Sequence, residues 1–194
     1  MKKDILIISD VHIGRADSNI KDLLPLLEKL SFKTLILNGD ILDQVAIWKD
    51  KGKLYKEEHS QYVSKIRKLL KRKKIKVYYL LGNHEFLFFP LIPFGFLFGV
   101  KIRNKLRYEN YLIEHGHLIV PYLKIRNLFN SCDKIYKKFH ENCITYSLVK
   151  NKRLIIGHSH DPKIIKGILY DSGDWVGSNT YLLMDSVNDV KLFG

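Results

Sequence analysis

The sequence is poor in cysteine and in long apolar runs, and each scarcity excludes a class of protein. Two cysteines, Cys132 and Cys143, in 194 residues are too few for a disulfide framework and form no Cys-x-x-Cys site, so we expect a reducing, cytoplasmic setting. The apolar run near the N-terminus is too short for a signal peptide and is better explained as a first strand. The chain has no repeat and no Pro/Gly/Ser-rich linker, which predicts one domain over residues 1–194.

Acidic residues are also scarce relative to basic ones. There are 20 Asp and Glu against 33 Lys and Arg, which gives a formal net charge of +13. A surface this basic favours anionic partners, namely nucleic acid, an anionic membrane surface or phosphorylated small molecules. The alternative is that the basic side chains only form solvated faces.

The most apolar stretch, residues 86–100, carries no charge and holds six of the ten phenylalanines. A transmembrane helix needs roughly 20 apolar residues, and Pro90, Pro93 and Gly95 interrupt this shorter stretch. Two interpretations stay open. The stretch is a buried connector, or it is an apolar loop that touches lipid, which would place the protein peripherally at the inner face of the membrane.

The pattern of apolar residues predicts alternating strands and helices. Continuous apolar runs, typical of strands covered on both faces, occupy residues 5–9, 34–38, 76–81, 111–114 and 153–156. Helical spacing is found over residues 23–30, 55–73 and 122–143, and shorter strands are expected over 164–170, 179–184 and 187–193. Such an order favours a layered α/β domain.

Each of the five central strands is followed by residues with metal-binding chemistry. They are Asp10-Val11-His12, Gly39-Asp40-Ile41-Leu42-Asp43, Gly82-Asn83-His84-Glu85, His115-Gly116-His117 and Gly157-His158-Ser159-His160. Ligands of open α/β sheets bind beyond the carboxyl ends of the strands, so these groups should share one crevice. Mixed carboxylate, amide and imidazole donors suit manganese, iron, nickel or zinc ions. Their number predicts two ions that share a bridging carboxylate.

The motif order DxH, GDxxD, GNHE, HGH, GHSH, over residues 10–160, resembles the calcineurin-like metallophosphoesterase superfamily. The resemblance implies a four-layer α/β/β/α sandwich that hydrolyses phosphoester bonds with two divalent ions, Mn²⁺ being expected and iron, nickel or zinc being alternatives. It implies that one ion is held by Asp10, His12, Asp40 and His160. It implies that the second is held by Asp40, Asn83, His115 and His158.

The same resemblance suggests roles for the other polar residues of the motifs. His84 would be the catalytic acid that protonates the departing alkoxide, with an orienting role as the alternative. Asp43 would support the metal ligands from behind. The role of His117 stays open.

The segment Gly173-Asp174-Trp175 is similar to one that follows the last histidine motif in UDP-2,3-diacylglucosamine pyrophosphatases, which cleave a nucleotide–lipid pyrophosphate at the membrane. This similarity makes a phosphorylated small molecule or lipid-linked nucleotide the expected substrate, and Asp174 and Trp175 candidate substrate contacts. It also implies that residues 118–152 form a short helical cap insert. That family generally carries Arg at the position of His84, so another phosphorylated lipid or nucleotide conjugate is at least equally compatible.

Further candidates come from the basic residues. Arg15, Arg103 and Arg107 are candidates for gripping substrate phosphate groups, and the basic run 71–74 is a candidate for attraction to an anionic membrane. Rival functions are a nuclease or cyclic-nucleotide phosphodiesterase on the same metal site, and a protein phosphatase. A non-catalytic scaffold or binding protein is a rival of another class, against which the complete set of ligand types argues.

Overall fold

The computed structural model describes residues 3–86, 100–119, 132–185 and 189–194. The strands are β1 (Lys3–Ile8), β2 (Thr34–Asn38), β3 (Lys76–Leu80), β4 (Lys101–Arg103), β5 (Lys105–Tyr108), β6 (Tyr111–Glu114), β7 (Arg153–Ile156), β8 (Lys163–Ile165), β9 (Leu169–Asp171), β10 (Tyr181–Asp185) and β11 (Val190–Phe193). The helices are α1 (Ile20–Lys29), α2 (Gln44–Lys49), the π-helix η1 (Tyr55–His59), α3 (Ser60–Arg72), α4 (Asn83–Phe86) and α6 (Cys132–Lys150).

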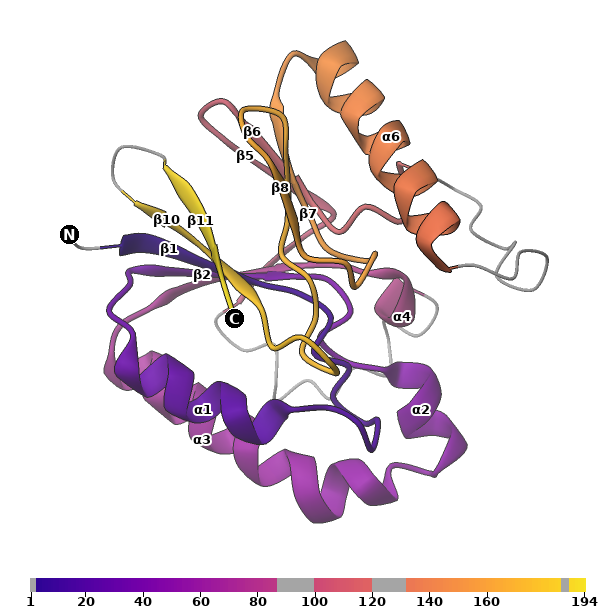
Figure 1. Cartoon of the computed structure of the whole chain (residues 1–194). Helices are drawn as coiled ribbons and strands as arrows, with labels where there is room; N and C mark the ends of the chain where they lie inside the picture. The colour runs from indigo at the N-terminus through magenta and orange to yellow at the C-terminus, as the bar shows by residue number, and fades with distance from the viewer. Residues whose placement is uncertain (1–2, 87–99, 120–131, 186–188) are drawn as a thin grey trace.

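Two β-sheets face each other, and helices cover their outer faces (Figure 1). The first sheet has the order β11-β10-β1-β2-β3-β4, and the second has the order β5-β6-β7-β9-β8. Helices α1 and α3 cover the first sheet, while α6 lies along the second. The predicted α/β/β/α sandwich is therefore confirmed.

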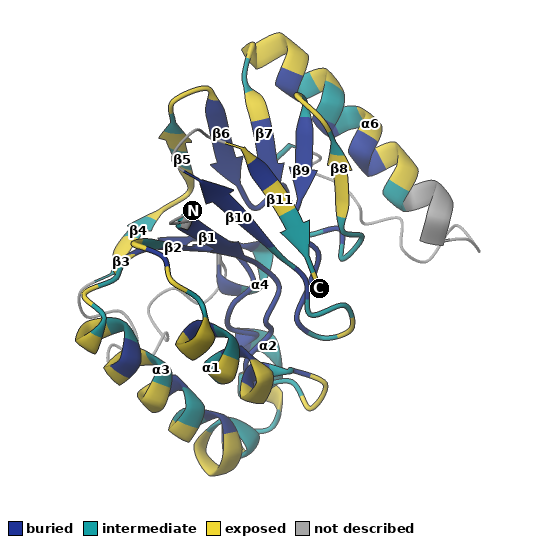
Figure 2. Ribbon diagram, turned by 60° about the vertical axis from the view of Figure 1, so that its left-hand side comes forward, coloured by how far each residue is buried: buried dark blue, intermediate teal, exposed yellow. Residues whose placement is uncertain are grey.

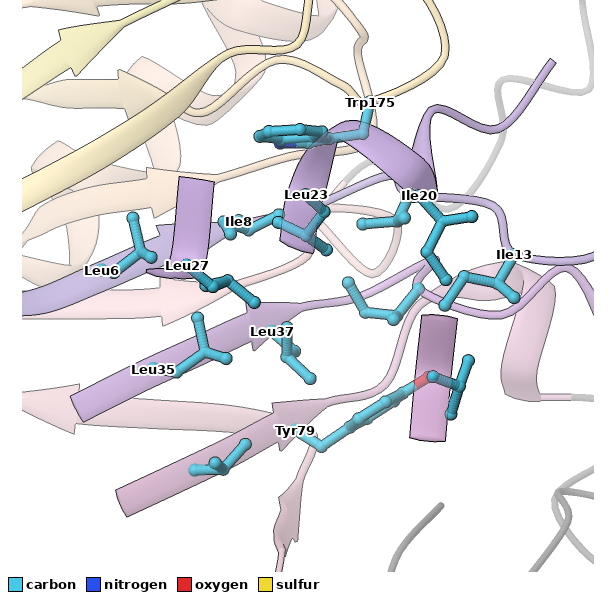
Figure 3. Packing of buried hydrophobic residues seen from close by; sticks show 14 of the residues in the cluster. Leu6, Ile8, Ile13, Ile20, Leu23, Leu27, Leu35, Leu37, Tyr79 and Trp175 are labelled. Carbon is cyan, nitrogen blue, oxygen red and sulfur yellow. The ribbon is translucent and has the colours of Figure 1, made fainter. Parts of the chain in front are cut away.

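The period-two alternation of the strands separates the apolar core into layers. In β1, Leu6 and Ile8 point toward α1 and α3, whereas Ile5 and Ile7 point toward the second sheet. Figure 3 shows the helix-facing layer, in which Leu23 of α1 lies among side chains of the first sheet. The central strands are buried on both faces, the edge strands such as β5 and β8 are partly exposed, and the helices expose their outer sides (Figure 2). This explains why the central strands read as continuous apolar runs.

Helix α1 ends at Lys29, and carbonyl groups at its end are satisfied by Lys73, the residue that follows α3. The ammonium group of Lys73 donates to the carbonyl oxygens of Leu27 and Glu28 at 2.8 Å each, and to that of Leu30 at 3.1 Å. A cation at a helix C-terminus also interacts favourably with the helix dipole. One member of the basic run 71–74 thus fastens two helices together.

Helix α6 is the crossover between the parallel strands β6 and β7. Its fully buried Phe139 and Cys143 pack on Leu154 and Ile156 of the second sheet. The helix predicted within the cap insert 118–152 is thus an outer layer of the sandwich. Residues 120–131 lie outside the described residues, so the cap over a substrate stays a prediction.

The tail and the edges show where the predicted elements differ. The strand expected over 164–170 is a hairpin, β8 and β9, because Gly167 turns the chain with φ +82°. The short elements β4, β5, α2 and α4 carry too few residues to show a period, and the apolar pattern did not predict them. Residues 87–99 lie outside the described residues, so both interpretations of the Phe-rich stretch stay open. No helix among the described residues is long and apolar enough to cross a membrane.

Candidate metal centre

The parallel strands bring the motif loops to one end of both sheets. Strands β1, β2 and β3 are mutually parallel, as are β6 and β7, so their carboxyl ends share one side of the molecule. The chain turns sharply just past these ends. Asp10, His12, Asp40, His158 and His160 all have positive φ, between 50° and 72°, a conformation uncommon in residues other than glycine. The strained turns aim the motif side chains into one region.

Close backbone approach at the centre requires two of the motif glycines. A Cβ atom at Gly82 would lie 2.1 Å from Asp40 Oδ1, and one at Gly157 would lie 2.4 Å from Ser9 Oγ. Neither position has room for a side chain. The glycines of the GNHE and GHSH motifs therefore allow the loops to pack directly against the carboxylates of the first two motifs.

Six of the seven predicted metal ligands gather with His84 in three overlapping groups. Within each group, one ligand atom from every residue lies within 4.8 Å of the others. The groups are Asp10, His12 and His160; His12, Asp40 and His84; and Asp40, His115 and His158. Asp40 and His12 each belong to two of the groups, and of the two only Asp40 is a carboxylate, the kind of side chain predicted to bridge the ions.

The seventh predicted ligand, Asn83, lies at the start of α4 beside these groups. The next residue, His84, donates its backbone N–H to Asp40 Oδ1 at 2.9 Å. Asn83 Oδ1 is buried and has no hydrogen-bond partner among the described residues. The structure thus brings the backbone next to Asn83 into contact with the carboxylate predicted to bridge the ions.

The polar atoms of the centre fit divalent cations. Asp10 Oδ1, Asn83 Oδ1 and His115 Nε2 are buried without a hydrogen-bond partner among the described residues. Such a group costs about 1–3 kcal/mol if it stays unsatisfied. Ligand-type atoms face each other closely instead: His115 Nε2 lies 3.2 Å from Asp40 Oδ2, and His160 Nε2 lies 3.3 Å from Asp10 Oδ1. Cations between these atoms would satisfy Asp10 Oδ1 and His115 Nε2.

Two of the histidines, His115 and His160, carry pKa values raised to about 10. Burial alone would lower the pKa of His115, but the carboxylates of Asp40 and Asp10 raise it to about 10. Burial is likewise outweighed at His160, where Asp10 and Asp174 raise the pKa to about 10. Before any cation binds, both imidazoles are therefore protonated at neutral pH and serve as counter-charges to the carboxylates.

Two further histidines of the centre, His158 and His117, have lowered pKa values instead. Burial and the nearby His115 lower the pKa of His158 to about 3 and that of His117 to about 4. Neutral imidazole is the form that binds metals. His117 packs against His115 with ring centroids 5.5 Å apart, and it belongs to none of the three groups.

Asp43 orients two imidazoles from behind. Its Oδ2 atom lies 2.9 Å from Nδ1 of His84 and 3.3 Å from Nδ1 of His12. Its Oδ1 atom accepts the backbone N–H of Ala46 at 2.8 Å, which caps α2. Burial tends to raise the pKa of Asp43, but its histidine and backbone contacts hold it well below the usual range. The Nε2 atoms of His84 and His12 therefore face the centre.

Glu85, which the sequence interpretation quoted but gave no role, is a fully buried clamp. Its carboxylate accepts the backbone N–H groups of Asp40, Ile41 and Leu42 at 2.7–3.0 Å, and that of Gly82 at 2.7 Å. Burial and the charge of Asp40 raise its pKa. Glu85 thereby joins the GDxxD and GNHE loops. A carboxylate directly after three polar motif residues was the available signal.

Asp174 and Trp175 have structural positions that differ from the predicted substrate contacts. Trp175 is 2% exposed, lies in the helix-facing core (Figure 3), and donates its indole N–H to the carbonyl of Thr180. Asp174 Oδ2 lies 3.1 Å from Nδ1 of His160. The burial of Trp175 argues against the predicted substrate contact, which stays untested, and Asp174 holds an imidazole in place.

The three candidate arginines are placed differently. Arg15 donates to Asp17 at 2.9 Å, and this contact raises its pKa, as do the charges of Asp43 and Asp174. Arg15 therefore lies beside the centre. The exposed Arg103 donates to the carbonyl of Ile102.

The structure does not bring Arg107 to the centre. It lines a hollow of about 310 Å³ together with Lys33 and Lys76. Lys33 precedes β2 and Lys76 begins β3, and the carboxyl ends of these strands, which lead to the metal ligands, are their other ends. Arg107 thus lies at the opposite end of the sheets.

Comparisons with known proteins show the family of this chain and agree with its fold. A family model described as calcineurin-like phosphoesterase matches residues 3–193. A solved structure described as a novel archaeal phosphodiesterase aligns with TM-score 0.52 at 14% identity, over 97% of this chain and 98% of that one. A single mutant of Vps29 from Entamoeba histolytica aligns with TM-score 0.51 at 16% identity, over 97% and 96%. At these identities the likeness shows the fold alone. No curated protein matches the sequence.

Proposed function

Because the chain belongs to the calcineurin-like phosphoesterase family, we propose that it is a hydrolase that cleaves a phosphoester or pyrophosphate bond with two divalent metal ions. The observation that carries the proposal is the position of Asp40. Its carboxylate belongs to two ligand groups at once, and one of them also contains His115, whose buried Nε2 lies 3.2 Å from Asp40 Oδ2.

The proposed division of ligands starts from the first and the third of these groups, adds Asp40 to the first as the bridge, and adds Asn83 to the third. One ion would be held by Asp10, His12, Asp40 and His160. The other would be held by Asp40, Asn83, His115 and His158. The mixture of nitrogen and oxygen donors favours a transition metal, and we propose Mn²⁺, with iron, nickel or zinc as alternatives.

Two such cations, when bound, lower the pKa of a water molecule and neutralise charge on the phosphate oxygens. The chain's own residues supply the geometry. The buried carboxylates of Asp10 and Asp40 supply the negative charge that draws two cations together. Asp43 and Asp174 fix the tautomer and direction of His12 and His160 through their Nδ1 atoms. Such outer contacts tune ligands and are often needed for affinity.

We propose His84 as the proton donor to the departing oxygen. Its side chain is 31% exposed, which leaves an edge open to substrate, and its Nδ1 faces Asp43. Burial tends to lower the pKa of His84, but Asp43 and Asp40 raise it above its ordinary value, which favours the protonated form. His84 also belongs to one ligand group, and the test for a ligand role is given in the Discussion.

For the substrate, we propose a phosphorylated small molecule or lipid-linked nucleotide. The net charge of +13 favours an anionic substrate, and Arg15 lies beside the centre where it could contact a phosphate. The Gly-Asp-Trp segment lends little support to a diacylglucosamine substrate, because Trp175 is a core residue.

The proposal is tested by hydrolysis with Mn²⁺ against four substrates: an aryl phosphodiester, a lipid-linked nucleotide diphosphate, single-stranded DNA and a phosphopeptide. We expect turnover of the first two, loss of turnover in Asp10→Asn, and no change in Asp22→Asn, a matched substitution of an exposed residue on α1. A protein that holds two ions yet hydrolyses none of the four would overturn the proposal.

A nuclease is the second candidate, and the excess of 33 basic over 20 acidic residues favours it. Binding of single-stranded DNA should then weaken steeply with salt, together with Mn²⁺-dependent cleavage. Salt-insensitive binding without cleavage would exclude it.

We also propose a cytoplasmic protein that associates peripherally with the inner face of the membrane. Sedimentation with anionic but not neutral vesicles is the expected result. Recovery with neither kind would contradict membrane association, and equal recovery with both would contradict attraction by the anionic charge.

A further inference from the structure

Helix α6 lies on the outside of the second sheet, yet two adjacent residues reach inward to the metal centre. The fully buried ring of Phe139 lies 5.5 Å from the ring of His158, between centroids. The next residue, His140, is 3% exposed. An outward-facing helix therefore presents an aromatic ring and an imidazole to the loop that carries His158 and His160.

His140 is tied to that loop through a buried carboxylate. Its Nε2 donates to Oδ2 of Asp171 at 3.0 Å, and the same oxygen accepts the hydroxyl of Ser159 at 2.6 Å. Asp171 Oδ1 accepts the backbone N–H of Gly173 at 3.0 Å. Asp171 is fully buried, so it depends on all three donors.

Ser159 occupies the position between two proposed metal ligands. The backbone N–H of Asp161 donates to the Ser159 hydroxyl at 3.0 Å, so the turn closes around this group. His158 and His160 have φ values of 72° and 59°. Residues other than glycine keep this conformation only where their surroundings impose it. Asp10 Oδ2 accepts the backbone N–H of His158 at 2.9 Å at the start of the turn, and the contact between Ser159 and Asp171 is the side-chain tether at its middle.

We propose that His140 is a positioning residue for the metal centre, acting through Asp171 and Ser159. By donating to Asp171, it holds the carboxylate where Ser159 needs it, and Ser159 holds the backbone that aims the imidazoles of His158 and His160. The inference rests on the proposed function only in taking these two histidines as metal ligands. Contacts that orient a ligand typically contribute about 10- to 100-fold in metal affinity.

The test is Mn²⁺ binding by calorimetry in three variants of α6. His140→Leu removes the donor, and the affinity for at least one ion should fall about 10- to 100-fold. His140→Gln keeps an N–H donor near the place of Nε2 and should restore most of it. Cys143→Ala is the matched control, because Cys143 is equally buried on the same helix and packs on the same sheet. It should lower the melting temperature and leave the Mn²⁺ affinity unchanged.

Wild-type affinity in His140→Leu, or equal weakening in His140→Leu and His140→Gln, would overturn the proposal. If His140→Leu does not fold, Ser159→Ala measures the same tether from its other end and should weaken Mn²⁺ binding to a similar degree. Unchanged affinity in Ser159→Ala would then be the contrary result. Metal affinity is measured without substrate, so a protein that hydrolyses nothing can still bear out the role of His140.

Discussion

The carboxylate of Asp43 and the imidazole of His84 form a close pair, with Oδ2 and Nδ1 2.9 Å apart. The same carboxylate caps α2 through Ala46, so a helix start fixes its direction. This arrangement leaves the Nε2 edge of His84 facing the centre. The pair explains why the GDxxD and GNHE motifs need their last aspartate and their histidine together.

Replacing His84 should slow turnover and leave the ions in place. In His84→Ala we expect turnover to fall about 100- to 10,000-fold, the usual contribution of a positioned proton donor. Metal content by elemental analysis should stay at the wild-type level. A parallel loss of metal would instead make His84 a ligand, as its membership of one ligand group allows.

Metal binding should release protons at neutral pH. His115 and His160 have pKa values raised to about 10, since nearby carboxylates outweigh the opposing effect of burial. A metal takes only the neutral imidazole, so affinity should rise as the pH is raised from 6 toward 9. Calorimetry in two buffers of different ionisation enthalpy measures the protons released. No release at pH 7 would contradict the pairing of these histidines with Asp10 and Asp40.

Glu85→Gln should destabilise the fold strongly. The carboxylate accepts four backbone N–H groups and the hydroxyl of Tyr79 in a fully buried position. The amide presents one NH₂ donor to these donors, so we expect a loss of about 3 kcal/mol or more of unfolding free energy, given about 1.5–3 kcal/mol for each bond to a charged group. Urea unfolding measures it, with the exposed Glu57→Gln as control. An equally small loss of unfolding free energy in both variants would contradict the proposed role of Glu85 as a clamp between the two loops.

Trp175→Phe should lower stability without changing KM. The indole fills the core and donates to Thr180, so the smaller ring leaves a cavity and an unpaired carbonyl, at a cost of about 1–3 kcal/mol. Thermal unfolding and steady-state kinetics on the same samples separate the two effects. A raised KM at unchanged stability would show instead that Trp175 contacts the substrate.

The sequence predicted the strands best where both faces are buried. Residues 34–38 form β2 as expected, because a continuous apolar run between polar turns has few other ways to bury itself. It missed β5 and the hairpin at Gly167, because elements of three or four residues carry no period. The positions of Asp10, Asp40 and His158 just after strands predicted that these residues lie together, since the carboxyl ends of parallel strands lie on the same side of a sheet.

Other features could not be predicted, because they depend on contacts between distant segments. Trp175 follows a motif-like Gly-Asp pair, and only the packing of α1 shows that its ring belongs to the core. The link from His140 to Ser159 joins α6 to the GHSH loop through Asp171 on a third element. Neither spacing nor composition marks such a contact.

The central claim is that two cations share Asp40, and anomalous diffraction from crystals grown with Mn²⁺ tests it most directly. The account predicts two peaks, about 3.5–4 Å apart as in other two-metal sites. One peak should lie against Asp10, His12 and His160, the other against His115 and His158, with Asp40 touching both. A single peak, or two peaks that share no carboxylate, would contradict the account.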